Sequence, residues 1–202
     1  MKTLLVTGLI GSGKSAVCDL LRQRGIPVYN ADERTKRLYD RRPSLVTRLE
    51  KVLGQSLRRT DGSLDRAALA AVIFRDAAAR ETLEGIVYPL VLQDFKRWRA
   101  RQKEAPFVVL ESAVLLSKPL FDALPDAVVL VTAPEPLRLQ RVMARDGLPE
   151  AAVRARMQAQ TIPEGRADAV LPNAGDARQL SQAVEQLFFD NNSYICQLIN
   201  KQ

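Results

Sequence analysis

A glycine-rich stretch directly behind an apolar run constrains this chain more than any other feature. Residues Gly8 to Ser15 read Gly-Leu-Ile-Gly-Ser-Gly-Lys-Ser, which matches the pattern G-x-x-x-x-G-K-[ST]. The apolar run Leu4-Leu5-Val6 precedes it, and a helix-compatible segment from Ala16 follows it. Such glycines let successive backbone N–H groups point into one concavity that binds phosphate oxygens at the start of a helix. The sequence therefore predicts a strand, a phosphate-binding loop and a helix, with an unrelated glycine-rich turn as the alternative.

Two side chains at the end of this loop have predicted roles in nucleotide binding. Lys14 is expected to reach the β- and γ-phosphates, and the Ser15 hydroxyl is expected to bind Mg²⁺. A nucleoside triphosphate with its metal is therefore the predicted ligand of the loop.

Composition limits the chemistry that the chain can perform. Its 202 residues include no histidine, which excludes histidine-based triads, ordinary zinc sites and histidine general bases. Acid–base catalysis must therefore rely on carboxylates. The two cysteines, Cys18 and Cys196, are too few for a disulfide framework, and we expect a reducing, cytoplasmic compartment. We expect no signal peptide or membrane span, because glycines and Lys14 interrupt the first apolar run.

The chain is also basic. Lys and Arg number 30 against 23 Asp and Glu, which gives a formal net charge of +7. This charge attracts polyanions, which include nucleic acids and phosphate-rich small molecules, although a merely soluble basic surface is an alternative. No basic strand studded with base-stacking aromatic residues is evident. Phe95 and Trp98 instead fall at the spacing of helical core residues, so we expect them to pack in the interior.

Strand and helix signals alternate, which predicts an α/β fold with a parallel sheet wrapped by helices. The expected strands are Thr3–Thr7, Ile26–Tyr29, Phe107–Leu110, Ala127–Thr132 and Ala169–Leu171. The chain divides into a core (residues 1–31, 105–133 and 167–189), a helical insert (32–104), an arginine-rich lid (134–166) and a tail (190–202).

Proline and glycine residues predict where helices end. We expect helix breaks in the insert near Pro43, between Gly54 and Gly62, and at Pro89. The lid should be interrupted at residues 147–149. A helix over residues 183–189 should close the core, whereas the tail loses helical periodicity and is expected to be loosely held.

Asp32 is predicted to lie close to the phosphate loop. A helix from Ser15 to Arg24 rises about 15 Å, and a strand of five or six residues returns roughly the same distance. Asp32 follows that strand, at the edge where open α/β sheets bind ligands. A carboxylate there can accept the proton of an attacking hydroxyl or help to hold Mg²⁺. Capping of the next helix is an alternative role, and the two roles could coexist.

Glu111 follows the expected strand Phe107–Leu110, where a carboxylate can support a metal and its waters. The alternative is a buried-edge carboxylate satisfied by neighbouring backbone N–H groups. We expect a supporting role behind the metal for this residue.

Arg138, Arg141 and Arg145 are spaced by three and four residues, so they share one helical face. Arginine can brace two phosphate oxygens at once, and phosphoryl transfer spreads charge over such oxygens. We therefore predict that this cluster contacts phosphate. The alternative is a solvated basic face paired with Asp146 and Glu150. Further candidates are Arg154, Arg156 and Arg166.

The combination of several sequence blocks is more specific than the loop alone. These blocks are Thr7–Ser15, Gly25–Asp32, Leu64–Leu69 with Val72–Phe74, Leu137–Leu148 and Asn173–Gly175. Together they resemble the dephospho-coenzyme A kinase family of P-loop kinases, in the family's order over residues 1–187. The resemblance implies a P-loop kinase-like three-layer α/β fold, a helical subdomain that holds the acceptor and a lid that closes over ATP. It implies transfer of the ATP γ-phosphoryl to the ribose 3′-hydroxyl of dephospho-coenzyme A, the last step of coenzyme A synthesis.

The same resemblance implies roles for single residues. Lys14, Asp32 and Arg141 would be catalytic, with Asp32 placed to activate the 3′-hydroxyl, and Ser15 would bind Mg²⁺. The residues that bind ATP would be Leu9, Ile10, Gly11, Ser12, Gly13, Lys14, Ser15, Ala16, Arg145, Asn173 and Gly175, the last two near the adenine. The residues that bind the acceptor would be Asp32, Arg66, Tyr88 and Glu111.

Several positions depart from the family pattern. Ala16 replaces the usual threonine, and Tyr88 stands where histidine is typical. Asn30 stands where an aspartate is usual, so Asp32 is the only acid of that pair. Glu111-Ser112-Ala113 replaces the commoner Asp-x-Pro.

Two other functions stay open at this point. Another small-molecule or nucleoside monophosphate kinase would share the loop, the lid and the insert. A nucleotide-dependent regulatory protein or nucleic-acid-binding ATPase is compatible with the charge, although the sequence contains no Asn-Lys-x-Asp segment for guanine recognition. We expect ATP and dephospho-coenzyme A as small-molecule substrates, and no nucleic acid, membrane or obligate protein partner.

Overall fold

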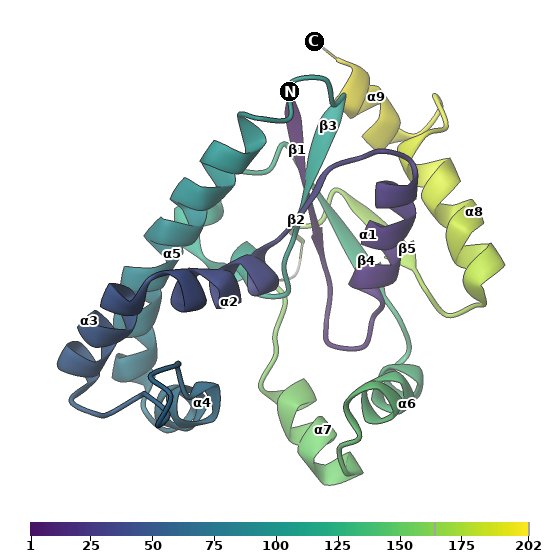
Figure 1. The fold of residues 1–202 in the computed structure, drawn as a ribbon. Coiled ribbons are helices and arrows are strands. Elements are labelled where there is room, and N and C mark those ends of the chain that lie inside the picture. Colours follow the sequence, from purple (N-terminus) through teal and green to yellow (C-terminus); the bar gives the residue numbers. More distant parts are fainter. Residues whose placement is uncertain (164, 202) are drawn as a thin grey trace. The chain divides into compact units, whose positions relative to one another are not determined.

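The computed structural model describes residues 1–163 and 165–201 (Figure 1). Position 164 of the expected lid and position 202 of the expected tail lie outside the described residues. The chain forms two compact units, the first made of Met1–Asn30 and Arg99–Gln202 and the second of Ala31–Trp98.

A parallel sheet of five strands forms the centre of the first unit, in the order β2-β3-β1-β4-β5. The strands are β1 (Lys2–Thr7), β2 (Val28–Asn30), β3 (Phe107–Glu111), β4 (Ala127–Thr132) and β5 (Ala169–Pro172). β3 is buried along its whole length, as is usual for parallel strands with both faces covered. The expected strands and the α/β class are confirmed, although the second strand begins at Val28 instead of Ile26.

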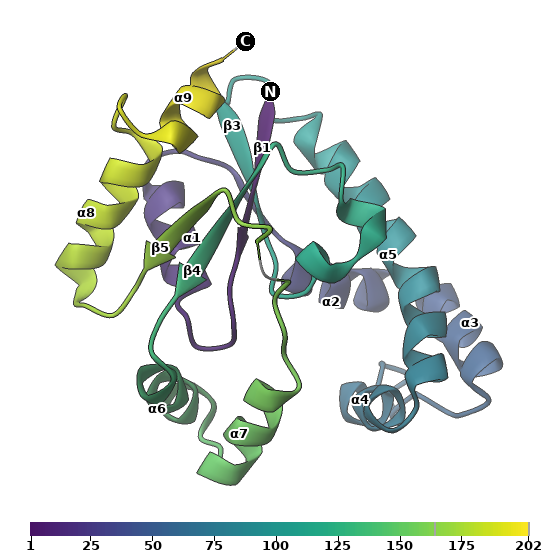
Figure 2. The same ribbon diagram turned by 180° about the vertical axis from the view of Figure 1, so that it is seen from behind.

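Three helices cover one face of this sheet (Figure 1). They are α1 (Lys14–Gln23), α8 (Ala177–Phe188) and α9 (Tyr194–Asn200). Leu4 of β1, Val17 of α1 and Val184 of α8 lie in one buried cluster. The opposite face is in view in Figure 2, where the segment between β3 and β4 forms the 3-10 turns η1 (Leu115–Ser117) and η2 (Pro119–Phe121). This framework fixes the edge of the sheet from which the phosphate loop projects.

The C-terminal segment differs from the expected loose tail. α9 buries Ile195, Cys196 and Ile199, and the two isoleucines belong to the main core cluster. A helix of seven residues is too short for its periodicity to stand out, yet it is stable once its apolar side chains dock on a core. The helix before it, α8, begins at Ala177 instead of residue 183, because Asp176 and Gln179 form a capping box.

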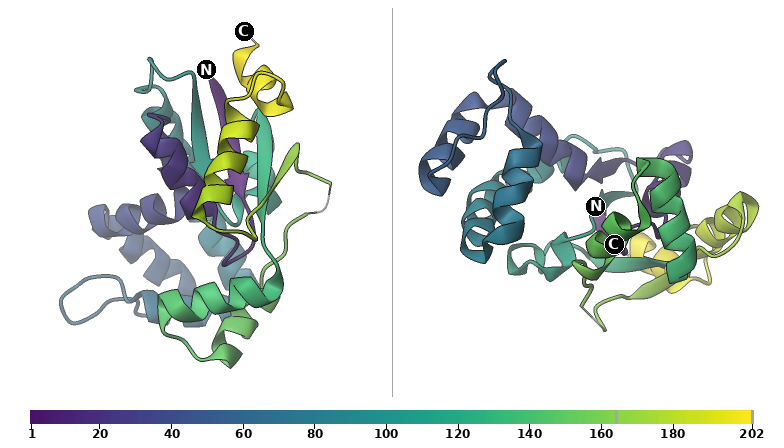
Figure 3. Two further views of the ribbon diagram at one scale, coloured as in Figure 1. Left: turned by 90° about the vertical axis from the view of Figure 1, so that its right-hand side faces the viewer. Right: turned by 90° about the horizontal axis from the view of Figure 1, so that it is seen from below.

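The segment expected to form the lid contains two helices beyond the carboxyl ends of the strands (Figures 1 and 3). They are α6 (Glu135–Asp146) and α7 (Glu150–Gln158), so the expected interruption at residues 147–149 is confirmed. Gly147 ends α6 with a left-handed φ of 64°, a conformation that favours glycine. Leu139 and Val142 of α6 pack against Val153 and Met157 of α7 in a small separate core.

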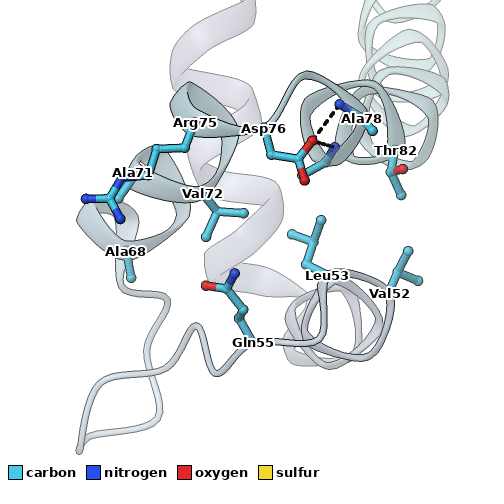
Figure 4. A pocket seen from close by; sticks show the side chains of 11 residues that line it. Val52, Leu53, Gln55, Ala68, Ala71, Val72, Arg75, Asp76, Ala78 and Thr82 are labelled. Atoms are coloured by element: carbon cyan, nitrogen blue, oxygen red, sulfur yellow. Dashed lines mark hydrogen bonds between the residues drawn. The ribbon is translucent and has the colours of Figure 1, made fainter.

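The regular elements of the second unit are all helices, apart from one isolated antiparallel bridge, Arg58 to Leu64, in the loop between two of them. Its helices are α2 (Ala31–Arg41), α3 (Pro43–Leu53), α4 (Arg66–Arg75) and α5 (Ala77–Arg99). The expected breaks at Pro43 and after Gly54 are confirmed. A pocket of about 480 Å³ lies between α3, α4 and the start of α5, with Val72, Arg75 and Gln55 on its walls (Figure 4). Asp32, Arg66 and Tyr88 do not line it.

The expected break at Pro89 is wrong. α5 continues through this proline, which costs a helix interior about 3 kcal/mol. Leu83, Val87 and Val91 are buried at four-residue spacing on either side of Pro89. Each such side chain gains about 1.5–3 kcal/mol on burial, so the stripe outweighs the local cost. No helix in the described part of the chain, α5 included, combines the length and the hydropathy needed to span a bilayer.

Candidate active site

The phosphate loop joins β1 to α1, as its sequence predicts. Gly11 and Gly13 have left-handed φ angles of 79° and 94°, which side chains other than glycine rarely adopt. A Cβ on Gly11 would lie 2.5 Å from the Arg138 carbonyl oxygen, and a Cβ on Gly13 would overlap the Asn173 amide. Both glycines are therefore needed because α6 and the end of β5 approach the loop closely.

Lys14 reaches back over this loop. Its Nζ donates hydrogen bonds to the carbonyl oxygens of Gly8 at 2.7 Å and Leu9 at 3.3 Å. The ammonium group is thus held at the loop by backbone acceptors. This position suits a group that balances the charge of bound phosphates.

Gln160, which follows α7, is a further residue at the phosphate loop that was not predicted from the sequence. Its Oε1 accepts a hydrogen bond of 2.6 Å from the backbone N–H of Ile10 in the loop. No motif marks this residue, and the two partners are 150 residues apart in the chain. The contact is visible only in the tertiary structure, and it ties the residues that follow α7 to the phosphate loop.

The three predicted arginines lie on α6 but have different surroundings. Arg141 donates from Nη1 to the Asn173 carbonyl oxygen at 3.1 Å and from Nη2 to Asn173 Oδ1 at 3.4 Å. Arg138 is buried and donates to the Ile10 carbonyl oxygen at 3.5 Å. Arg145 is paired with its neighbour Asp146, and that hydrogen bond raises the pKa of Arg145 and lowers the pKa of Asp146.

A pocket of about 210 Å³ joins two of these arginines to the phosphate loop. Its lining residues are Gly11, Gly13, Lys14, Ser15, Arg141, Val142 and Arg145. The structure therefore brings Arg141 and Arg145 together with the loop. The alternative of a solvated basic face paired with Asp146 and Glu150 holds in part, since exposed Arg145 is paired with Asp146. Glu150 pairs instead with Arg154.

Glu111 lies at the end of β3, and its side chain is satisfied by other side chains. Its Oε1 accepts from the Ser15 hydroxyl at 2.7 Å, and its Oε2 accepts from Asn30 Nδ2 at 2.9 Å. Arg22 Nη2 lies 3.7 Å from Oε2.

Burial and the nearby Glu111 charge raise the pKa of the Cys18 thiol, which therefore stays protonated.

The residues around Ser15 fit a magnesium ion. The Ser15 hydroxyl and the Glu111 carboxylate offer the hard oxygen donors that Mg²⁺ prefers. The described residues contain no group of three or more His, Cys, Asp or Glu side chains that could hold a metal. This is compatible with Mg²⁺, which usually takes one or two protein oxygens and fills its shell with phosphate oxygens and water.

Asn173 and Gly175 follow the end of β5. Asn173 is 5 % exposed, and its Nδ2 donates to the Ser12 carbonyl oxygen at 2.8 Å. A Cβ on Gly175 would overlap the Gln179 side chain, which bonds back to the Asp176 backbone in the α8 capping box. Gly175 therefore has a local structural reason to be glycine.

The other predicted residues belong to the helical unit. α2 begins at Ala31, so Asp32 lies inside its first turn and not at the capping position that the alternative role requires. Arg66 donates to both carboxylate oxygens of Asp40, at 2.9 and 3.0 Å. The Tyr88 hydroxyl is 3.4 Å from Glu84 Oε1. Burial, then the charges of Glu84 and Asp32, raise the pKa of Tyr88.

Comparison with known proteins identifies the family. The model of the dephospho-CoA kinase family matches residues 3–179. The dephospho-CoA kinase of Porphyromonas gingivalis is 40% identical over 178 residues, which cover 86% of this chain and 87% of the relative. The crystal structure of TT1252 from Thermus thermophilus has a TM-score of 0.80 at 36% identity and covers 93% of this chain and 96% of that one.

A more distant solved structure has the same fold. The dephospho-CoA kinase from Campylobacter jejuni has a TM-score of 0.66 at 23% identity, with coverage of 93% of this chain and 96% of that chain. The family model, the curated relative and the strand–loop–helix geometry agree. This chain belongs to the dephospho-CoA kinase family.

Proposed function

We propose that this protein transfers the γ-phosphoryl group of ATP to the ribose 3′-hydroxyl of dephospho-coenzyme A, giving coenzyme A and ADP in the last step of coenzyme A synthesis. One observation carries this proposal. In a chain of this family, the phosphate loop and two lid arginines line a single pocket. Phosphoryl transfer needs this combination of a backbone cradle and positive charge.

The proposed chemistry is an in-line displacement. The acceptor oxygen forms a bond to the γ-phosphorus while the bond to the ADP oxygen breaks, and the hydroxyl proton leaves. Because the transition state is loose, the protein contributes mainly positioning and electrostatic stabilisation. Lys14 and the N–H groups of the loop would bind the phosphates of ATP. Arg141 and Arg145 would stabilise the negative charge on the transferred phosphoryl group.

We assign acceptance of the hydroxyl proton to Asp32. The residue lies two positions after β2, whose carboxyl end belongs to the ligand-binding edge of a parallel sheet. The chain has no histidine, so a carboxylate is the natural general base. Asn30, the neighbouring polar residue at the strand end, is bonded to Glu111, which supports Asp32 as the base.

Mg²⁺ is the proposed metal. The Ser15 hydroxyl would bind it, and Glu111 would orient that hydroxyl and the metal's waters. When bound, the metal neutralises charge on the β- and γ-phosphates. Because both Glu111 oxygens accept hydrogen bonds from Ser15 and Asn30, we assign Glu111 to the metal side and not to direct contact with the acceptor.

Acceptor binding is assigned to the helical unit. Arg66 and Tyr88 would contact the acceptor, and a phosphate there would compete with Asp40 for the Arg66 guanidinium. Both cysteines are free and buried, which suits the reducing compartment of the cytoplasm.

The test is a mass measurement of the acceptor after incubation with purified protein and Mg-ATP. We expect dephospho-coenzyme A to gain one phosphoryl group. Lys14→Ala should abolish detectable transfer, and Asp32→Asn should slow it by about 10²–10⁴-fold, the usual contribution of a general base. A panel with nucleoside monophosphates and shikimate tests other kinase activities. Phosphorylation of one of these in place of dephospho-coenzyme A would refute the proposal.

A further inference from the structure

Asn173 has hydrogen-bond partners on three different elements of the first unit. Its backbone N–H donates to the Thr132 carbonyl oxygen of β4 at 2.7 Å. Its Nδ2 donates to the Ser12 carbonyl oxygen of the phosphate loop at 2.8 Å. Its carbonyl oxygen and its Oδ1 both accept from Arg141 of α6. The residue is 5 % exposed, so these contacts are made out of water.

Only one orientation of the Asn173 amide satisfies its neighbours. A carbonyl oxygen such as that of Ser12 accepts and needs a donor, whereas a guanidinium such as that of Arg141 only donates. The NH₂ group therefore faces Ser12, and Oδ1 faces Arg141. Aspartate would lose the donor to Ser12. Alanine would lose both side-chain bonds and keep only the bond from Arg141 to the backbone carbonyl oxygen of residue 173.

Gly13 of the phosphate loop packs closely against Asn173 and Arg141. A Cβ on Gly13 would overlap the Asn173 amide and would lie 3.8 Å from Arg141 Nη1. Arg141 also lines the pocket formed by Gly11, Lys14 and Ser15. The guanidinium has five N–H donors, of which Asn173 takes two. Donors therefore remain for phosphate oxygens in that pocket.

We propose that Asn173 is a positioning residue that fixes Arg141 relative to the phosphate loop. This inference rests on the proposed phosphoryl transfer. In this role the side chain acts through Ser12 and Arg141. Displacement of a catalytic group by about 1 Å typically costs on the order of 10²-fold in rate, so a single amide in this position has a large effect.

A double-mutant cycle tests the proposal. Asn173→Ala should lower kcat by about 10- to 100-fold, with the KM for dephospho-coenzyme A unchanged. In an Arg141→Ala background the same substitution should lower kcat by no more than about 3-fold, because the positioned group is gone. An equal fold-loss in both backgrounds would overturn the proposal. Asn192→Ala, at an exposed position, is the matched control and should leave kcat unchanged.

A ligand that lacks the adenine base tests whether Asn173 acts by positioning Arg141 or by contacting the base. Calorimetry with Mg-tripolyphosphate and with Mg-ATP measures the affinity of wild type and Asn173→Ala. Positioning predicts the same fold-weakening for both ligands, whereas a loss confined to Mg-ATP would assign Asn173 to the base and refute the proposal. This readout needs no acceptor, so it stands even if dephospho-coenzyme A is not phosphorylated.

A conservative variant covers the case in which Asn173→Ala does not fold. Asn173→Asp keeps an acceptor for Arg141 but places a carboxylate against the Ser12 carbonyl oxygen. This variant should bind Mg-tripolyphosphate and Mg-ATP more weakly than wild type, by the same factor of about 10-fold or more. Wild-type affinity for both ligands in this variant would contradict the role of the Ser12 contact.

Discussion

Glu111 connects Ser15 at the end of the phosphate loop to β2. Its carboxylate accepts hydrogen bonds from Ser15 and Asn30, and Arg22 lies 3.7 Å away. A buried carboxylate is tolerated only when hydrogen-bond donors or positive charges compensate its negative charge. The position of Glu111 at a strand end was predictable from the sequence. Its partner Asn30 was not, because β2 and β3 bring Asn30 opposite Glu111 only when they pair.

Glu111→Gln should lower the stability of the fold and raise the Mg²⁺ concentration that the enzyme requires. Glutamine keeps the shape of the side chain but sets an NH₂ donor against Ser15 or Asn30 and removes the charge near Arg22. We expect the free energy of unfolding, measured in urea, to fall by about 1–3 kcal/mol. The Mg²⁺ concentration for half-maximal activity should rise by about 10-fold or more.

The matched control is Glu150→Gln on the surface, where Glu150 pairs with exposed Arg154. It should change the free energy of unfolding by less than about 1 kcal/mol. If the Mg²⁺ requirement of Glu111→Gln equals that of the control, Glu111 does not act on the metal side.

Tyr39 should make the protein sensitive to alkaline pH. Burial raises the pKa of this phenol to about 12 from its ordinary value of 10.0. Between these values the unfolded chain loses the proton first, so the folded state binds more protons and stability falls as pH rises. Tyr39→Phe removes this contribution. Between pH 10 and 12, the free energy of unfolding of wild type should therefore fall by about 1–3 kcal/mol more than that of Tyr39→Phe.

Urea denaturation across this pH range measures the difference. Tyr194→Phe, at an exposed side chain, should follow the wild-type profile. Parallel profiles for wild type and Tyr39→Phe would show that the phenol titrates alike in the folded and unfolded states.

At the scale of elements, two glycines of the helical unit have the same open surroundings but different backbones. Nothing lies within 4 Å of a Cβ added to Gly85 or to Gly54. Gly85 is inside α5, where alanine is the better helix former. Gly54 ends α3 with a left-handed φ of 65°, which penalises any Cβ.

The same substitution should therefore act in opposite directions. Gly85→Ala should raise the free energy of unfolding by about 0.5–1 kcal/mol. Gly54→Ala should lower it by about 1–2 kcal/mol. Thermal or urea unfolding of the two variants beside wild type checks both signs. Destabilisation by Gly85→Ala would mean that α5 needs glycine where it accommodates Pro89.

At the scale of the whole molecule, the net charge of +7 should assist capture of two anionic substrates. Salt screens such attraction, since the Debye length shortens from about 10 Å at 0.1 M to about 3 Å at 1 M. We expect kcat/KM for dephospho-coenzyme A to fall several-fold as potassium chloride rises from about 0.05 to 0.5 M, with kcat at saturation nearly constant. Steady-state kinetics at each salt concentration test this. A flat kcat/KM would exclude electrostatic steering as a rate factor.

Features that depend on neighbouring residues were readable from the sequence alone. A strand, a glycine-rich turn and a helix follow from the local backbone preferences of residues 4–21. The shared face of Arg138, Arg141 and Arg145 follows from helical periodicity. The positions of the strands and the break between α6 and α7 rest on equally local signals, whereas the order of the strands in the sheet depends on pairing between distant segments. The nucleotide loop and its arginines were therefore predictable.

Features that depend on packing between distant segments were decided by the tertiary structure. The continuity of α5 through Pro89 and the docking of α9 follow from burial, which outweighs local preference. The bonds from Gln160 to Ile10 and from Asn173 to Ser12 join residues 150 and 161 positions apart. A side chain at such a distance leaves no periodic or compositional signal, because its partner is set by how the sheet packs with α6 and α7.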